Sequence, residues 1–191
     1  MTLIDEWDRG ICSTKPDNDY VHLVQSAMAD LYANGECVKY AYNFATWERA
    51  DDRDSMLKLI DEYLDEKVDL VTIQLGENVS DVSTYQEDME SLISFVQVKA
   101  PNAKIIVIGD FWSAQRNELR KMAAMNKNIS FADLSEIRGV VEYQSEAGMI
   151  CYMIDGTTQT VTSKMAAHPG DKGMVYIAEQ VISEYQKAIN Q

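Results

Sequence analysis

The sequence is poor in the residue types that build metal sites and disulfide frameworks. It contains only two histidines, His22 and His168, which are too few for a histidine-rich metal site. The three cysteines are Cys12, Cys37 and Cys151, and they show no CxxC spacing. Because their number is odd, at least one of them cannot pair within the chain. We therefore expect buried free thiols in a reducing compartment, and no metal site.

Long apolar runs and an excess of basic residues are missing as well. No run approaches the roughly 20 apolar residues that cross a bilayer, so we expect no membrane association. The segment 1–7 has neither the basic region nor the apolar region of a signal peptide, which predicts a cytoplasmic protein unless a longer precursor exists. The 31 acidic residues outnumber the 17 basic ones, giving a formal net charge of −14. Such a surface repels phosphate backbones and excludes nucleic acid as a partner.

The order of the predicted elements is that of an α/β protein. The 191 residues are expected to form a single domain, residues 1–191, in which 1–16 are irregular. Helices are predicted over 17–33, 51–64, 83–99, 114–125 and 171–189, strands over 37–42, 68–75, 103–108 and 129–132, and a small hairpin around 155–156. Strands that alternate with helical crossovers are typical of a parallel sheet.

Polar residues follow the predicted strands where those strands end. In parallel sheets, ligands bind beyond the carboxyl ends of the strands, so these residues are candidates for chemistry. They are Asn43, Glu77, Asn78, Asp110 and Asp133.

Asn78 and His168 are the residues best suited to acyl transfer. Asn78 follows Gly76 at the end of the most apolar strand, where its amide could donate to a developing oxyanion. The alternative is an asparagine that caps a turn. His168 precedes Pro169–Gly170 and the last helix, so it lies in a loop from which it could act as a general base. The alternative is a solvated loop histidine.

Two further strand ends carry candidate binding residues. Glu77 and Asp110 could bind substrate, hold a metal or do acid–base work, although solvated loop acids are the simpler interpretation. Trp112 could line a substrate pocket, or belong to the core or to a hydrophobic lid. No Walker A, GxGxxG, HExxH or GxSxG pattern is present.

Together these segments resemble the SGNH (GDSL-type) hydrolase superfamily. The run Leu75–Asn78 matches the family's asparagine block, and Ala167–Met174 matches its histidine block. The segment 19–23 adds to a similarity that covers most of the chain. The resemblance implies a three-layer α/β/α fold of flavodoxin-like type with a mainly parallel sheet. It also implies Asn78 as oxyanion donor and His168 as base.

The sequence departs from the family pattern in three blocks. The aspartate three residues before the histidine is replaced by Met165; some relatives work with a Ser–His dyad whose histidine is oriented by a backbone carbonyl. Asn43 stands near the family's glycine block and is the candidate second oxyanion donor. The serine block is absent, so the first strand of the fold is expected to be missing. The nucleophile is expected to be a serine of that block, missing from this chain, and the alternative is Ser13, the one serine near that end of the chain.

The resemblance implies an esterase that removes acetyl or another small acyl group from a carbohydrate or a similar polar ester, without a cofactor. The lost serine block leaves a second hypothesis open: a non-catalytic SGNH-like domain that binds glycan or a protein partner. A flavodoxin-like binding or signalling domain is a third hypothesis, disfavoured because no phosphate-binding glycine loop is visible. An incomplete sheet would also expose an edge that favours homo-oligomers.

Overall fold

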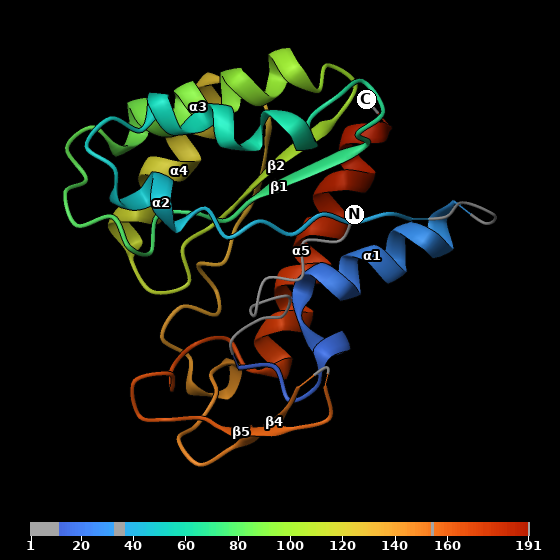
Figure 1. Ribbon diagram of the computed structural model, residues 1–191, viewed down its shortest axis with the longest axis vertical. Helices are drawn as coiled ribbons and strands as arrows, with labels where there is room; N and C mark the ends of the chain where they lie inside the picture. Colours follow the sequence, from blue (N-terminus) through green and yellow to red (C-terminus); the bar gives the residue numbers. More distant parts are fainter. Residues whose placement is uncertain (1–11, 33–36, 154, 191) are drawn as a thin grey trace. The chain divides into compact units, whose positions relative to one another are not determined.

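The computed structural model describes residues 12–32, 37–153 and 155–190 (Figure 1). These residues form two compact units. The first contains the described residues of Met1–Asn43 together with Gly139–Ile182, and the second contains Phe44–Arg138 together with the described residues of Ser183–Gln191. The expectation of a single domain over residues 1–191 stays a prediction.

The second unit is built on a three-stranded parallel sheet with the order β1-β2-β3. Its strands are β1 (Leu70–Ile73), β2 (Lys104–Ile108) and β3 (Ser130–Ala132). The central strand β2 pairs with both neighbours, placing Val71 opposite Ile105 and Val107 opposite Phe131. Four of its five residues are buried, which explains its continuous apolar sequence. All three of these predicted strands are confirmed, with somewhat shorter ends.

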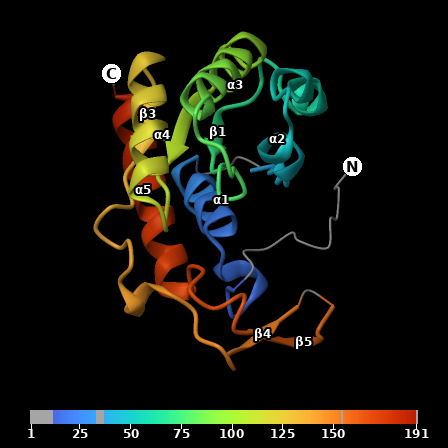
Figure 2. The ribbon, with the colours of Figure 1, turned by 90° about the vertical axis from the view of Figure 1, so that its left-hand side faces the viewer.

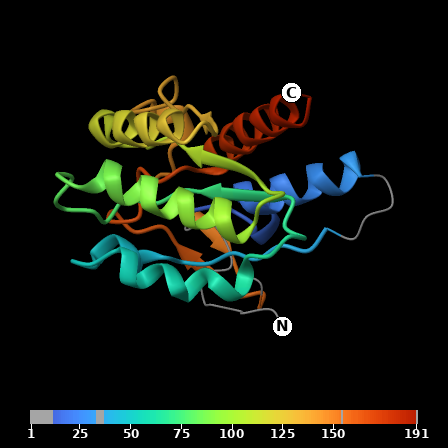
Figure 3. The same cartoon turned by 90° about the horizontal axis from the view of Figure 1, so that it is seen from above.

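Helices lie on both sides of this sheet. Helix α3 (Tyr85–Lys99) and helix α4 (Ala114–Asn126) contact each other on one face of the sheet. Helix α3 connects β1 to β2 and α4 connects β2 to β3, and two right-handed connections that proceed in the same direction place both helices on the same face. Figure 3 shows α3 (green) between α4 (yellow) and the 3-10 helix η2 (Asp54–Tyr63, teal). The last turns of α5 (Asp171–Ile189) lie on the other face (Figure 1). The predicted α/β class with a mainly parallel sheet is confirmed.

The core of the second unit lies between the strands and these helices. Buried aliphatic residues of β1 and β2 pack against buried residues of α3 and α4. They include Ile73, Ile105, Val107, Met89, Leu92, Ile93, Val96, Ala123 and Ala124.

Local signals fix where several helices begin. The Asp19 carboxylate accepts a hydrogen bond from the backbone N–H of His22 at 2.9 Å, which caps α1 (Tyr20–Leu31). Ser113 caps α4 through the backbone N–H of Arg116 at 3.2 Å. The predicted cap at Asn34–Gly35 lies outside the described residues.

Two predicted elements differ from the structure. The helix expected over 51–64 is the 3-10 helix η2 (Asp54–Tyr63), which follows the short helix α2 (Ala45–Arg49). The strand expected over 37–42 is wrong, because these residues pair with no described strand and leave Val38 65% and Tyr40 60% exposed. Strand-forming side chains make a strand only where a neighbouring backbone completes the ladder.

The first unit contains α1, the first part of α5 and a small antiparallel hairpin (Figure 2). The hairpin strands are β4 (Ile150–Tyr152) and β5 (Thr158–Thr160), which confirms the hairpin predicted around 155–156. Two 3-10 turns, η1 (Pro16–Asn18) and η3 (Val141–Tyr143), complete this unit. Cys12 and Cys151 share a small buried cluster with Val161, and all three cysteines are free thiols, although Cys37 is partly exposed and not buried as expected.

Across the ranges that the structure describes, no helix combines the length and the apolar character that a membrane span requires.

Candidate functional site

In the first unit, the loop that contains His168 is hydrogen-bonded through its backbone to the segment 143–145. The backbone N–H of Ser145 donates to the His168 carbonyl at 2.8 Å, and that of Gly170 donates to the Tyr143 carbonyl at 3.0 Å. A side chain at Gly170 would meet the Gln144 carbonyl oxygen at 3.1 Å, so this contact favours glycine. The sequence His-Pro-Gly therefore makes a loop whose path is set by backbone contacts.

The ring of His168 is oriented by a backbone carbonyl. Its Nδ1 lies 2.7 Å from the carbonyl oxygen of Met165. A carbonyl can only accept, so Nδ1 carries the proton and Nε2 carries the lone pair of a base. This is the arrangement expected of a Ser–His dyad that lacks the aspartate.

Ala167, directly before His168, has a left-handed backbone with φ +69°. This conformation is uncommon for a residue with a Cβ and costs on the order of 1–3 kcal/mol. Such strain persists where the surrounding contacts impose it, and here the N–H of Ala167 donates to the Ser145 carbonyl at 3.1 Å.

Ser13 is fully buried in the same unit as His168, and both of its neighbours bond to the His168 region. The thiol of Cys12 donates to the Met165 carbonyl at 3.2 Å, the same oxygen that accepts from His168. On the other side, the N–H and hydroxyl of Thr14 donate to the Asp171 carboxylate at 2.7 and 2.5 Å.

Asp171 is the residue that fastens the N-terminal segment to the start of α5. Besides the two bonds from Thr14, its carboxylate accepts from the side-chain amide of Asn18 at 2.9 Å. A carboxylate in the first turn of a helix is also favoured by the helix dipole.

Asn78, in the second unit, is exposed, but both ends of its side-chain amide are hydrogen-bonded. Its Nδ2 donates to the Glu48 carboxylate at 2.5 Å, and its Oδ1 accepts from Arg49 at 3.3 Å. The second carboxylate oxygen of Glu48 accepts from the backbone N–H of Gly76. Glu48 is 4% exposed, and nothing in its sequence position pointed to this role.

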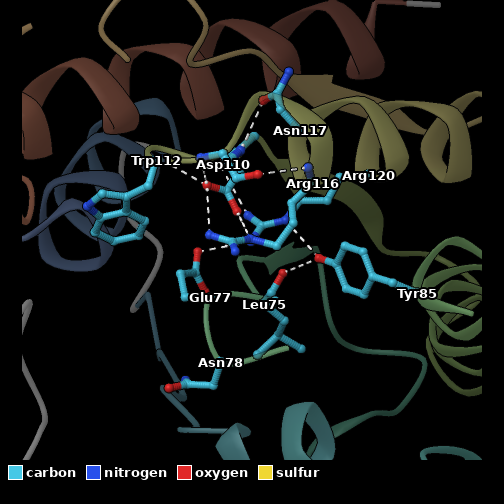
Figure 4. A network of polar contacts seen from close by, with 12 residues as sticks. Leu75, Glu77, Asn78, Tyr85, Asp110, Trp112, Arg116, Asn117 and Arg120 are labelled. Carbon is cyan, nitrogen blue, oxygen red and sulfur yellow. Dashed lines mark hydrogen bonds and ion pairs between the residues drawn. The ribbon is translucent and has the colours of Figure 1, made fainter. Parts of the chain in front are cut away.

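Glu77 and Asp110 are joined by a buried guanidinium rather than solvated (Figure 4). Arg120 of α4 donates to Glu77 at 3.0 Å and to Asp110 at 3.2 Å, and its side chain is fully buried. Asp110 is fully buried as well and also pairs with Arg116 at 2.6 Å. For Asp110 the interpretation as a solvated loop acid is therefore wrong. The space between the two carboxylates that a metal would need is taken by Arg120.

The same arginine reaches the ends of β1 and β2. It donates to the carbonyl oxygens of Ile108 at 3.0 Å and Gly109 at 3.2 Å, and to the hydroxyl of Tyr85 at 2.8 Å. Tyr85 in turn donates to the carbonyl of Leu75 at 2.5 Å. Backbone carbonyl groups that follow the paired part of β1 and lie at the end of β2 thus accept hydrogen bonds from side chains.

Burial and charge shift the proton affinities in this network. Burial alone would raise the pKa of Asp110, but the hydrogen bond from Arg116 and the charge of Arg120 lower it below its ordinary value. Burial opposes the charge of Arg120, yet Glu77, Tyr85 and Asp110 together raise its pKa above the usual range. Burial raises the pKa of Tyr85 to about 12, against the attraction of Arg120. The network is held charged, with a neutral tyrosine.

Trp112 and Asn43 are the remaining residues predicted for the site. Trp112 is 37% exposed; its backbone N–H donates to the Asp110 carboxylate at 2.8 Å, and its ring lies edge-on against that of Phe111. Asn43 is exposed and lies outside any helix or strand. The roles of Trp112 in substrate binding and of Asn43 as an oxyanion donor stay predictions.

The structure thus groups the predicted residues by unit. Ser13 and His168 belong to the first, while Glu77, Asn78 and Trp112 belong to the second. The convergence of Asn78 and His168 on one ester carbonyl stays a prediction. Within the described ranges, no group of three or more histidine, cysteine or acidic residues is arranged to hold a metal ion.

Comparison with known proteins shows what the chain is similar to. No model of a known protein family matches it, and no curated protein matches it in sequence. Its structure is similar to the crystal structure of a possible lipase from Chitinophaga pinensis DSM 2588, with a TM-score of 0.53 and 14% sequence identity. The match covers 90% of this chain and 89% of that chain. The chain therefore shares the α/β fold of that protein.

Proposed function

We propose that this chain is an SGNH-type esterase that hydrolyses small acyl esters, such as acetyl groups on a carbohydrate. The observation that carries the proposal is the 2.7 Å contact between Nδ1 of His168 and the Met165 carbonyl oxygen. It gives the imidazole the tautomer and orientation of a general base without an aspartate.

Ser13 is the proposed nucleophile. Its hydroxyl oxygen attacks the ester carbonyl carbon while Nε2 of His168 takes the hydroxyl proton. The proposed oxyanion donors are the side-chain amides of Asn78 and Asn43. His168 then returns the proton to the leaving alcohol, and water releases the acyl group from Ser13 by the same two steps.

The bonds made by the two neighbours of Ser13 support its assignment as the nucleophile. Cys12 and Thr14 bond to Met165 and Asp171, which lie three residues before and three residues after His168. Ser13 is the residue between these two attachments, and His168 is central in the loop to which they attach. No other serine of the sequence was a candidate.

A second function, an SGNH-like domain that binds acylated carbohydrate without cleaving it, is favoured by one observation. Ser13 has no solvent-exposed surface. A nucleophile must be reached by the ester, so this burial supports binding over turnover.

Labelling and turnover separate the two functions. A fluorophosphonate probe should modify Ser13 of the wild-type chain, as located by mass spectrometry. Ser13→Ala and His168→Ala should each lower p-nitrophenyl acetate hydrolysis by about two to four orders of magnitude. Ser163→Ala, at an exposed position of the same unit, is the matched control and should leave the rate unchanged.

If neither probe modification nor turnover depends on Ser13 and His168, the esterase proposal fails. Binding of an acetylated oligosaccharide by calorimetry, with no release of acetate, would then support the non-catalytic domain.

A further inference from the structure

Glu48 holds the turn at the end of β1 through two bonds. One carboxylate oxygen accepts from the backbone N–H of Gly76, and the other accepts from the side-chain amide of Asn78. Gly76 has φ +123°, a region that disfavours side chains. A Cβ at that position would also lie 2.1 Å from the Tyr85 hydroxyl. Both the backbone conformation and the close Tyr85 hydroxyl therefore require glycine at position 76.

Arg120 and Tyr85 hold the same turn from the other side. The guanidinium of Arg120 pairs with Glu77, and the hydroxyl of Tyr85 donates to the carbonyl oxygen of Leu75. Every residue from Leu75 to Asn78 is thus bonded to a side chain of α2, α3 or α4. Figure 4 shows the bonds from Arg120 to Glu77 and from Tyr85 to Leu75.

Such anchoring is more than a turn requires. Taking a carboxylate and a guanidinium out of water opposes folding, and pairing offsets this only in part. Glu48 is 4% exposed and Arg120 is fully buried. Binding and catalytic side chains keep a fixed geometry when packing and hydrogen bonds from surrounding residues hold them in place.

The bond from Glu48 determines which way the Asn78 amide faces. A carboxylate can only accept, so it selects the NH₂ end of the carboxamide, while the guanidinium of Arg49 selects the oxygen end. The amide cannot flip without losing both contacts. Its second N–H is left in a fixed direction on an exposed side chain.

We propose that Glu48 is a positioning residue that orients the Asn78 carboxamide as the oxyanion donor. The proposal rests on the esterase function inferred above. It assigns to Glu48 an effect on the transition state that is exerted through Asn78 and not through contact with the ester.

Nuclear magnetic resonance of the Asn78 side chain tests the orientation directly. In the wild type, one of the two amide protons should be shifted downfield by its carboxylate partner and should exchange slowly. The shift should be lost in Glu48→Gln and kept in Glu118→Gln, an exposed control on α4. The Asn78→Ala variant identifies the signal. Two equivalent, fast-exchanging protons in the wild type would overturn the proposal.

Kinetics test the positioning. Glu48→Gln should lower kcat for p-nitrophenyl acetate by about tenfold to a hundredfold, with little change in KM. The same substitution should change kcat much less when Asn78 is already alanine, because the two residues act as one unit. Glu48→Asp, which keeps the charge, should recover part of the rate. Equal losses in both backgrounds would contradict a role through Asn78.

The two measurements keep this inference separate from the esterase proposal. A wild-type chain without turnover would end the esterase proposal, while the amide signals would still decide whether Glu48 orients Asn78. A variant that fails to fold is recognised by its circular dichroism, and Glu48→Asp then carries the comparison.

Discussion

The Met165 carbonyl oxygen takes the place of an aspartate beside His168, at 2.7 Å from Nδ1. A carbonyl fixes the tautomer but brings no full negative charge to stabilise an imidazolium. The proposed base, His168, is therefore oriented by the backbone, so we expect its orientation to depend on the path of the whole loop more than on any one neighbouring side chain.

Asp171 should be important for the stability of the first unit. In Asp171→Asn, an NH₂ group replaces one acceptor oxygen and faces the donors of Thr14 and Asn18. We expect the free energy of unfolding to fall by about 1–3 kcal/mol. Urea denaturation followed by circular dichroism measures it. Asp17→Asn, exposed in the same segment, should change stability by less than about 0.5 kcal/mol. Equal effects of the two substitutions would contradict this prediction.

Arg120 should be among the least replaceable residues of the second unit. Arg120→Met keeps much of the side-chain volume but removes one of the two guanidinium groups that pair with the buried Asp110. Only Arg116 still pairs with this carboxylate. We expect a loss of about 3–5 kcal/mol, seen as a lower midpoint in urea. Lys58→Met, on the exposed side of η2, is the control and should be nearly neutral. A midpoint for Arg120→Met within error of that control would show that the network contributes little.

Tyr85 should make the protein sensitive to alkali. Its pKa is raised to about 12 by burial, whereas in the unfolded chain it is about 10. The folded state therefore holds the proton more tightly. The stability from this group is complete below about pH 10 and is lost as the pH rises towards about 12, with a slope near 1.4 kcal/mol per pH unit.

Comparison with Tyr85→Phe isolates that effect. Phenylalanine does not titrate, so its free energy of unfolding should fall less steeply than that of the wild type in the same pH window. Urea titrations at a series of pH values give both slopes. Parallel curves would mean that Tyr85 has the same pKa in the folded and unfolded chain.

The three thiols should differ in accessibility. Cys12 and Cys151 are buried at 0% and 1% exposure, while Cys37 is partly exposed. Ellman's reagent should therefore react with one thiol per chain under native conditions, and with three in urea. Cys37→Ser should remove the native reaction. Fast labelling of all three without denaturant would contradict the packing of the first unit.

Locally encoded features were predictable from the sequence, and long-range ones were not. Helix α4 begins directly after its capping residue Ser113, helix α5 carries Asp171 in its first turn, and the apolar run of β2 identified a central strand. The run 37–42 has the composition of a strand, but a ladder depends on a partner that composition cannot supply.

The site was predictable only as separate residues. Glu48 and Asn78 are 30 positions apart, and Thr14 and Asp171 are 157 apart. The acceptor for His168 is a main-chain atom, which any residue at 165 would provide, so the sequence showed only that the aspartate was missing. Buried ion pairs such as that of Arg120 look, in sequence, like exposed helix charges.

The left-handed Ala167 has a consequence for how this loop can change. A glycine there would remove the backbone penalty and raise stability by about 1 kcal/mol. It would also widen the range of conformations open to the neighbouring imidazole. The methyl group of Ala167 therefore lowers the stability of the loop and, at the same time, restricts the orientation of the proposed base, so stability and proposed function place opposite demands on this position.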